Sequence, residues 1–305
     1  MKQTLVILSN HTKISRKHQR IYLETYKSSQ AVPLTLINGI IIYGKATITS
    51  DALSACAKHN VPVCFVSKYG KIKGVFMPNF LSSANNKRIL QYHIYINSRL
   101  EVAKEIVLRK LKEIEYYFSL DFRDIEPVLK RTSNYSVILG CEGRASKEMF
   151  EKFGELVNSA GWKFSGRSYR PPRDKVNALL SSAYTLGYSL AMVLICIFGL
   201  DPYLSFLHIK RGRHASFASD LMELIRPKLT YLIARLIKEG KINKSDFVKD
   251  KNAYFLSKNG YSAVLSIYEE YKEEMISIMK DFVLNLEKFY KDNKSQGKIN
   301  VDSAL

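Results

Sequence analysis

The stretch Val176–Leu200 places the strongest limit on the fold, because none of its 25 residues is charged. A helix of that length could cross a bilayer. Polar side chains nevertheless interrupt the run, at Asn177, Ser181, Ser182, Tyr184, Thr185, Tyr188 and Ser189. We therefore expect a buried helix over residues 174–198, in a protein with no membrane partner. Asp174 is its expected N-cap and Gly199 its expected end.

The charge of the chain restricts its partners. The net charge is +19, from 47 lysines and arginines against 28 acidic residues. Such an excess attracts polyanions, with nucleic acid as the first choice and an anionic membrane as the second. A lysine-rich surface that only keeps the protein soluble is the alternative. The four cysteines form no C-x-x-C pair, and the N-terminus has too short an apolar run for a secretory leader. We expect reduced thiols in a cytoplasmic protein.

Composition divides the chain into two regions with a polar linker at residues 78–87. Residues 1–77 are expected to be β-rich, with one helix over residues 51–59 and Thr49 or Ser50 as its N-cap. The expected strands are residues 4–8, 20–24, 33–37, 40–43, 61–67 and 74–77, with a turn at Asn38-Gly39. Residues 88–305 are expected to be helical. The predicted fold class is α+β, with a small N-terminal sheet or sandwich followed by an all-α domain.

Within the helical region, the segment Gly199–Pro227 combines a histidine with two carboxylates. Asp220 and Glu223 are three residues apart and share one face of a helix. The same D-x-x-E spacing also describes an N-cap with a glutamate at its third helical position, which needs no metal. His208 is expected to end an apolar helix that starts at Asp201-Pro202, where a lone histidine is commonly a satisfied core group. A reversal after it would bring the imidazole to the carboxylates, a mixture that suits Mg²⁺ or Mn²⁺.

Glu142 is a third candidate ligand, because it lies in mid-helix between Gly140 and Gly143. A glycine in a helix interior costs about 1 kcal/mol relative to alanine. Close approach of a ligand or of another backbone would compensate for that cost. Tight helix packing beside a surface glutamate is the alternative interpretation. His214, in the loop before Asp220, competes with His208 as a ligand but is expected to be exposed.

Two basic clusters are candidates for contacts with phosphate. The first is RSYRPPRD, in which arginines alternate with a tyrosine on a segment stiffened by two prolines; the second is the loop after His208. Arginine forks bind phosphate oxygens, and an aromatic ring offers a stacking surface. A solvated loop is the alternative. The candidate residues are Arg167, Arg170, Arg173, Lys210, Arg211 and Arg213. The sequence contains no P-loop or dinucleotide fingerprint, so no nucleotide cofactor is expected.

Four blocks of sequence, in this order, carry a family resemblance: LGCEGRAS, YRPPRDKVNALLSSAYTLGY, GLDPYLSFLH and DLMELIRP. They resemble the CRISPR-associated protein one family, the universal nuclease of spacer acquisition, and the resemblance extends over nearly the whole chain. It implies an N-terminal β-sandwich for dimerisation at residues 1–77 and a helical catalytic domain at residues 88–305. The chain departs from many relatives in reading LIRP at the end of the last block and in carrying His214.

The resemblance also implies a site and an activity. A divalent cation, Mg²⁺ or Mn²⁺, would be held at the positions of Glu142, His208 and Glu223, with Asp220 as a further catalytic residue. The implied function is a metal-dependent DNA endonuclease and integrase of CRISPR adaptation. It would join the 3′-hydroxyl ends of a short DNA duplex into the repeat array by transesterification. The implied partners are double-stranded DNA, a second copy of the chain and CRISPR-associated protein two.

Two other classes of function are compatible with the same residues. A dimeric architectural protein would bind DNA without catalysis, and its carboxylates would only cap a helix. A peripheral membrane protein would use the uncharged helix together with the basic surface.

Overall fold

The structure is a computed structural model, which describes residues 3–7, 11–26, 28–67, 72–78, 82–168, 171–208 and 214–295. Backbone contacts divide the chain into two compact units. The first consists of Met1–Gln91 with Ser189–Pro202, and the second of Tyr92–Tyr188 with Tyr203–Leu305. The α+β fold class is confirmed, because a β-rich N-terminal region precedes a helical one. The domain boundaries at residues 77 and 88 stay a prediction.

Two four-stranded sheets make up most of the first unit. The first sheet has the order β1-β5-β7-β8, from Gln3–Ile7, Ile37–Tyr43, Val63–Val66 and Ile72–Phe76. Its first three strands are parallel and β8 is antiparallel to β7. The second sheet has the order β4-β3-β2-β6, from Ser29–Pro33, Arg20–Glu24, Thr12–Lys17 and Ala46–Ile48. A 3₁₀ turn, Leu34–Leu36, separates β4 from β5.

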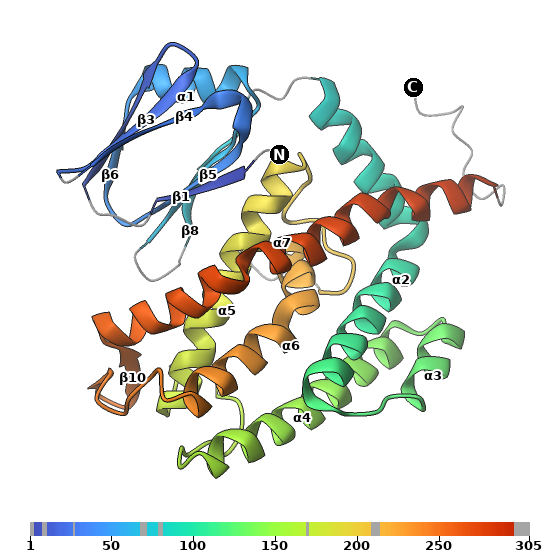
Figure 1. Cartoon of the computed structure of the whole chain (residues 1–305). Helices are drawn as coiled ribbons and strands as arrows, with labels where there is room; N and C mark the ends of the chain where they lie inside the picture. The colour runs from blue at the N-terminus through green and yellow to red at the C-terminus, as the bar shows by residue number, and fades with distance from the viewer. Residues whose placement is uncertain are drawn as a thin grey trace. The chain divides into compact units, whose positions relative to one another are not determined.

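One apolar core joins both sheets to helix α1, Ser50–Lys58 (Figure 1). Ile14 from one sheet, Ile40 from the other and Cys56 from α1 are all fully buried in it. This arrangement agrees with the sandwich-like expectation. Thr49 is confirmed as the N-cap of α1, because its hydroxyl accepts a hydrogen bond from the Ala52 amide at 3.2 Å.

The expected turn at Asn38-Gly39 is wrong, because both residues lie inside strand β5. A Cβ at Gly39 would come within 2.8 Å of Ile197, a residue of the same unit. The glycine therefore serves the close approach of Ile197 to the strand rather than a reversal of the chain.

The second unit is mainly helical. The helices of this region are α2 (Ser82–Phe118), α3 (Ile125–Arg131), α4 (Tyr135–Ser159), α5 (Lys175–Ile197), α6 (Ser216–Lys238) and α7 (Lys258–Ser295). Helix α2 has a kink at Ser98, and it begins within the stretch expected to be a linker. A two-stranded hairpin, β9 (Phe247–Asp250) with β10 (Ala253–Leu256), interrupts the helices and was not predicted.

The uncharged stretch forms α5 as expected. It is the one helix among the described residues that is long and apolar enough to cross a membrane, and most of it is buried inside the protein. Asp174 is confirmed as its N-cap, since Asp174 Oδ1 accepts a hydrogen bond from the Asn177 amide at 2.7 Å. Gly199, with a φ of 70°, is confirmed as its end. The Leu200 amide turns back to the carbonyl of Ile195.

Helix α6 contacts both α4 and α7 and is buried along nearly its whole length (Figure 1). Polar side chains that are almost fully buried project from it, among them Asp220 and Glu223. Buried carboxylates are costly unless they are paired and hydrogen-bonded. The position of α6 therefore requires partners for both groups.

Candidate active site

Asp220 organises the chain segment before α6. Its fully buried carboxylate accepts hydrogen bonds from the backbone amides of Phe206 (2.6 Å), Leu207 (3.0 Å) and His208 (2.9 Å). It also lies 2.8 Å from Nδ1 of His208. The helix expected to start at Asp201-Pro202 is therefore wrong, because residues 201–208 form turns and bends. A carboxylate that binds three successive amides competes with helix formation there.

The same contacts overturn the interpretation of Asp220 and Glu223 as a helix cap. Helix α6 begins at Ser216 after Ala215, so Asp220 lies in its second turn, away from the unpaired amides of the helix start. An ionised carboxylate only accepts hydrogen bonds, so Nδ1 of His208 carries a hydrogen atom and donates the hydrogen bond to Asp220. That arrangement fixes the orientation of the ring and leaves Nε2 for another partner.

Glu142 and Glu223 share one cation, the ammonium group of Lys110. Lys110 comes from α2 and is fully buried, and its Nζ donates to Glu142 and, at 2.6 Å, to Oε2 of Glu223. Ser146, one turn after Glu142 on α4, accepts a third hydrogen bond from Nζ at 2.7 Å and donates to Glu142 at 2.8 Å. Lys110, Glu142 and Glu223 thus meet from three different helices, α2, α4 and α6.

His208 and Arg226 complete the surroundings of Glu223. Nε2 of His208 lies 3.8 Å from Oε1 of Glu223, which is beyond hydrogen-bond range. A guanidinium nitrogen of Arg226 lies 2.8 Å from the same oxygen. The structure therefore links Glu142 to Glu223 through Lys110 and places the His208 ring beside Glu223. We refer to Lys110, Glu142, His208, Asp220 and Glu223 as the carboxylate cluster.

The charges in the carboxylate cluster shift its pKa values. Burial alone would raise the pKa of Glu223, but attraction to Arg226, Lys110 and His208 outweighs it and lowers the pKa to about 2. Burial alone would lower the pKa of His208, but its hydrogen bond to Asp220 and the charge of Glu223 raise that pKa above its ordinary value. Burial also opposes the charge of Lys110, and attraction to Glu223 and Glu142 raises its pKa.

The cluster has the donor chemistry of a divalent-cation site. Two carboxylates and one imidazole nitrogen suit Mg²⁺ or Mn²⁺, and the ammonium of Lys110 stands between the carboxylates as a cation would. Within the residues that the structure describes, no three side chains of His, Cys, Asp or Glu are close enough to ligate an ion as they stand. Since Lys110 separates the glutamates, an ion at that place requires the ammonium to give way.

The two glycines beside Glu142 do not serve tight packing. A Cβ on Gly140 or Gly143 would meet no atom within 4 Å among the described residues. The alternative interpretation, a close helix–helix contact, is therefore wrong. The surface of α4 at these two glycines is open among the described residues.

The other predicted residues lie in different surroundings. Arg167 is held by the protein, since its guanidinium donates to Asn177 at 2.7 Å and to Ser181 at 3.2 Å. Arg173 is exposed. His214 stacks on Tyr188 with ring centroids 4.9 Å apart and lies 2.6 Å from the hydroxyl of Ser219. Four predicted residues lie outside the described part of the chain: Arg170, Lys210, Arg211 and Arg213.

The sequence analysis did not single out Lys110, although the sequence carries a signal for it. Ala103, Val107 and Ile114 are buried at helical spacing on α2, and Lys110 falls on the same stripe. A lysine on the apolar face of a helix requires a buried anionic partner. That requirement points to the two glutamates, which are distant in sequence.

A family model described as CRISPR associated protein Cas1 matches residues 5–270. The chain belongs to this family. It is 29% identical over 282 residues to the CRISPR-associated endonuclease Cas1 of Methanocaldococcus jannaschii, covering 90% of this chain and 86% of that protein. It is also 29% identical to the CRISPR-associated endonuclease Cas1 of Pyrococcus horikoshii, covering 88% and 85%.

Solved structures share the fold. A Cas1 protein from Thermotoga maritima matches with a TM-score of 0.77 and 25% identity, over 95% of this chain and 96% of that one. A casposase bound to an integration product matches with a TM-score of 0.65 and 24% identity, over 88% and 86%. A chain of a partial Cas6-RT-Cas1–Cas2 complex matches with a TM-score of 0.71 and 19% identity, over 98% and 97%.

Proposed function

We propose that this protein is a divalent-metal-dependent DNA endonuclease and integrase of CRISPR adaptation. It joins the 3′-hydroxyl ends of a short DNA duplex into the repeat array by transesterification, exchanging one phosphodiester for another without nucleotide fuel. The observation that carries the proposal is the shared cation of Glu142 and Glu223 beside Nε2 of His208. Membership of a family whose curated relatives are named endonucleases supports the same activity.

Glu142, His208 and Glu223 would hold Mg²⁺ or Mn²⁺. When bound, the ion supplies positive charge to the phosphodiester and lowers the pKa of the attacking hydroxyl group. Asp220 contacts the site through His208, so it acts as a positioning residue. It keeps the proton of the imidazole on Nδ1 and thereby leaves Nε2 free. Arg226 pairs with Oε1 of Glu223 and helps to keep this carboxyl group ionised. With water in place of the hydroxyl group, the same residues would support hydrolysis of DNA.

The DNA contacts would come from the basic segments on either side of α5. Their proposed members are Arg167, Arg170, Arg173, Lys210, Arg211 and Arg213. Arginine and lysine contacts to phosphates give affinity that falls steeply with salt and carry little sequence information. The proposed partners are double-stranded DNA, a second copy of the chain joined through residues 1–77, and Cas2. A structural neighbour bound to an integration product and one in a complex with Cas2 support DNA and Cas2 as partners. The proposed location is the cytoplasm.

The substitution Glu223→Gln tests the proposal. It removes one charge and keeps the size of the side chain, so strand joining with Mn²⁺ on a branched DNA substrate should fall at least about 100-fold. Glu148→Gln is the matched control, because Glu148 lies on α4 in a surface pair with Arg144, and it should leave the rate unchanged. Full strand joining by a folded Glu223→Gln protein would refute the metal-binding role of Glu223. A folded wild-type protein that binds DNA but joins no strands would instead favour the non-catalytic architectural protein.

A further inference from the structure

The β9–β10 hairpin lies against the turn before α5, outside the carboxylate cluster. The amide of Tyr254 donates a hydrogen bond to the carbonyl of Pro172 at 3.0 Å, and Nζ of Lys175 donates to the carbonyl of Lys244 at 2.7 Å. The hairpin is therefore tied to the turn by backbone groups. Side-chain substitutions on the hairpin leave those carbonyl and amide contacts in place.

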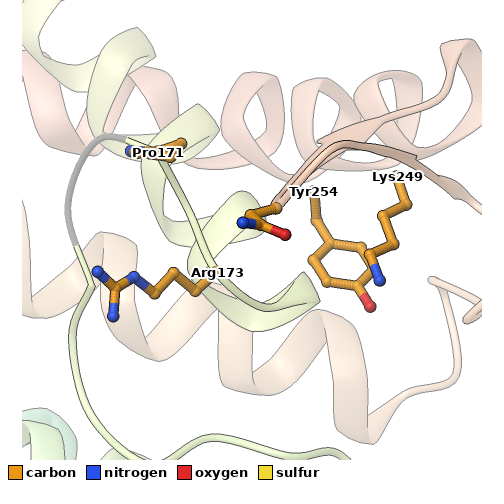
Figure 2. A pocket seen from close by; sticks show the side chains of 5 residues that line it. Pro171, Arg173, Lys249 and Tyr254 are labelled. Atoms are coloured by element: carbon orange, nitrogen blue, oxygen red, sulfur yellow. The ribbon is translucent and has the colours of Figure 1, made fainter.

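An open pocket of about 520 Å³ lies between the hairpin and the turn (Figure 2). Its lining residues are Pro171, Arg173, Lys249, Asn252 and Tyr254. The volume falls within the range of roughly 300–1,000 Å³ that small-ligand sites occupy. Among the described residues, the pocket is lined by a proline, two cations, an amide and an aromatic ring, and by no carboxylate.

The register of the hairpin places these groups together. Lys249 and Tyr254 are directly opposite each other in the antiparallel pair, so both side chains project from one face. Figure 2 shows the Lys249 side chain running beside the Tyr254 ring, and its ammonium lies 5.9 Å from the ring centroid. The next pair, Val248 and Phe255, projects from the other face.

The two cations that line the pocket are available to a ligand. In the part of the chain that the structure describes, neither Arg173 nor Lys249 forms an ion pair with a carboxylate. Asp250, which follows Lys249, alternates to the opposite face of β9. Asp174, which follows Arg173, accepts hydrogen bonds from the amide and the side chain of Asn177. A ligand that pairs with these two cations and stacks on the tyrosine carries a negative charge next to a flat ring. A nucleotide of a DNA strand has both features.

We propose that this pocket, which we call the hairpin pocket, binds one nucleotide of a single-stranded DNA segment. Lys249 binds the phosphate on one side of the nucleotide and Arg173 the phosphate on the other side, the base stacks on Tyr254, and the Asn252 amide offers donor and acceptor groups to the base edge. A single strand is required, because the face of a base inside a duplex is covered by its neighbours and cannot reach an aromatic ring. This assignment rests on the proposed action on DNA and adds a strand-binding site to it.

The test compares Tyr254→Ala with Phe255→Ala in the full chain. Phe255 is the matched control, because it is an aromatic residue of the same strand that is 50% exposed on the opposite face. Binding is measured by fluorescence anisotropy with a labelled duplex that carries 3′ single-stranded overhangs, and with the same duplex made blunt. Tyr254→Ala should weaken overhang binding roughly 5- to 100-fold, as loss of base stacking does, and leave blunt-duplex binding unchanged. Phe255→Ala should change neither.

Two further variants separate stacking from charge. Tyr254→Trp keeps an aromatic face and should retain overhang binding, while Lys249→Gln should reduce the salt slope of overhang binding by about 0.7, the share of one single-strand phosphate. Thermal melts check that each variant is folded. Overhang binding by Tyr254→Ala at wild-type strength would overturn the assignment, and so would an equal loss on both DNAs. Displacement of the overhang by millimolar inorganic phosphate alone would reveal a simple anion site and overturn it as well.

A wrong assignment of the hairpin pocket gives a different experimental result from a wrong proposed function. If the wild-type chain binds both DNAs and joins strands, but Tyr254→Ala changes nothing, only the pocket assignment is wrong. If the wild-type chain binds neither DNA and joins no strands, the proposed action on DNA is wrong, and the pocket assignment falls with it.

Discussion

Replacing Lys110 by methionine removes the ammonium that Glu142 and Glu223 share. Methionine fills a similar volume, so the change is mainly one of charge. Removing one partner of a buried ion pair costs about 3–5 kcal/mol, because the remaining charge stays buried without compensation. Lys110 and Glu223 are 0% and 2% exposed, so solvent screens their interaction little.

Two features place the expected loss at the lower end of that range. Arg226 still lies 2.8 Å from Glu223 after the substitution, and Glu142 is 22% exposed, so water reaches it. We expect Lys110→Met to lower the free energy of unfolding by about 3 kcal/mol. The measurement is urea unfolding followed by circular dichroism at pH 7 in EDTA. Lys112→Met is the control, because Lys112 is exposed on the same helix, and it should change stability by less than about 0.5 kcal/mol.

A metal titration then tests whether Lys110 stands where a cation binds. Without the ammonium, the two carboxylates attract Mn²⁺ more strongly, and an ion at 100 times its dissociation constant stabilises the folded state by about 2.7 kcal/mol. Mn²⁺ should therefore raise the stability of Lys110→Met more than that of the wild type, in which the ammonium competes. Stability of the variant equal to wild type in EDTA would refute the buried ion pair. An equal gain from Mn²⁺ in both proteins would refute the competition.

Two further predictions concern Asp220 and the glycines. Asp220→Asn removes the negative partner of His208, so burial then dominates and the pKa of His208, followed by NMR in EDTA, should fall below its wild-type value. The raised pKa stabilises the wild type fully below the ordinary histidine pKa of about 6.5 and is lost as pH rises through the folded value, so the stability difference should shrink at alkaline pH. Gly187→Ala would place a Cβ 2.6 Å from Leu229, and it should cost about 1–3 kcal/mol in thermal or urea unfolding. Gly143→Ala would place a Cβ with no atom of the described residues within 4 Å, and it should instead stabilise the protein by up to about 1 kcal/mol. Opposite signs of the two changes would contradict the packing argument.

Local signals in the sequence predicted the elements that local contacts determine. The hydroxyl of Thr49 and the carboxylate of Asp174 each bind an amide three residues ahead, so the helix starts could be identified without knowledge of the fold. The uncharged run predicted the buried helix α5, and Gly199 marked its end. The convergence of Glu142 with Glu223 was inferred through the family resemblance, because periodicity alone says nothing about contacts between distant helices.

The elements that the sequence analysis missed depend on distant partners or carry polar side chains. Residues 201–208 look helical, but Asp220 binds the amides of residues 206–208 instead. Strand β2, Thr12–Lys17, buries Thr12 and Ile14. It also carries three basic residues, so its sequence does not show the alternation of apolar and polar residues that identifies a strand. The hairpin strand β9 leaves most of its side chains exposed. Its stability comes from pairing with β10 and from the bond to Pro172, which no local pattern reveals.

The charges of the carboxylate cluster balance one another within the protein. Glu142, Asp220 and Glu223 bring three negative charges close together, which would repel one another strongly inside a protein. Lys110 and Arg226 neutralise two of them, and the backbone amides around Asp220 stabilise the third. A divalent cation in place of the ammonium would raise the positive charge between the glutamates from one to two. Such an exchange would free the Lys110 side chain from both carboxylates, so occupancy by metal and the position of Lys110 would be linked.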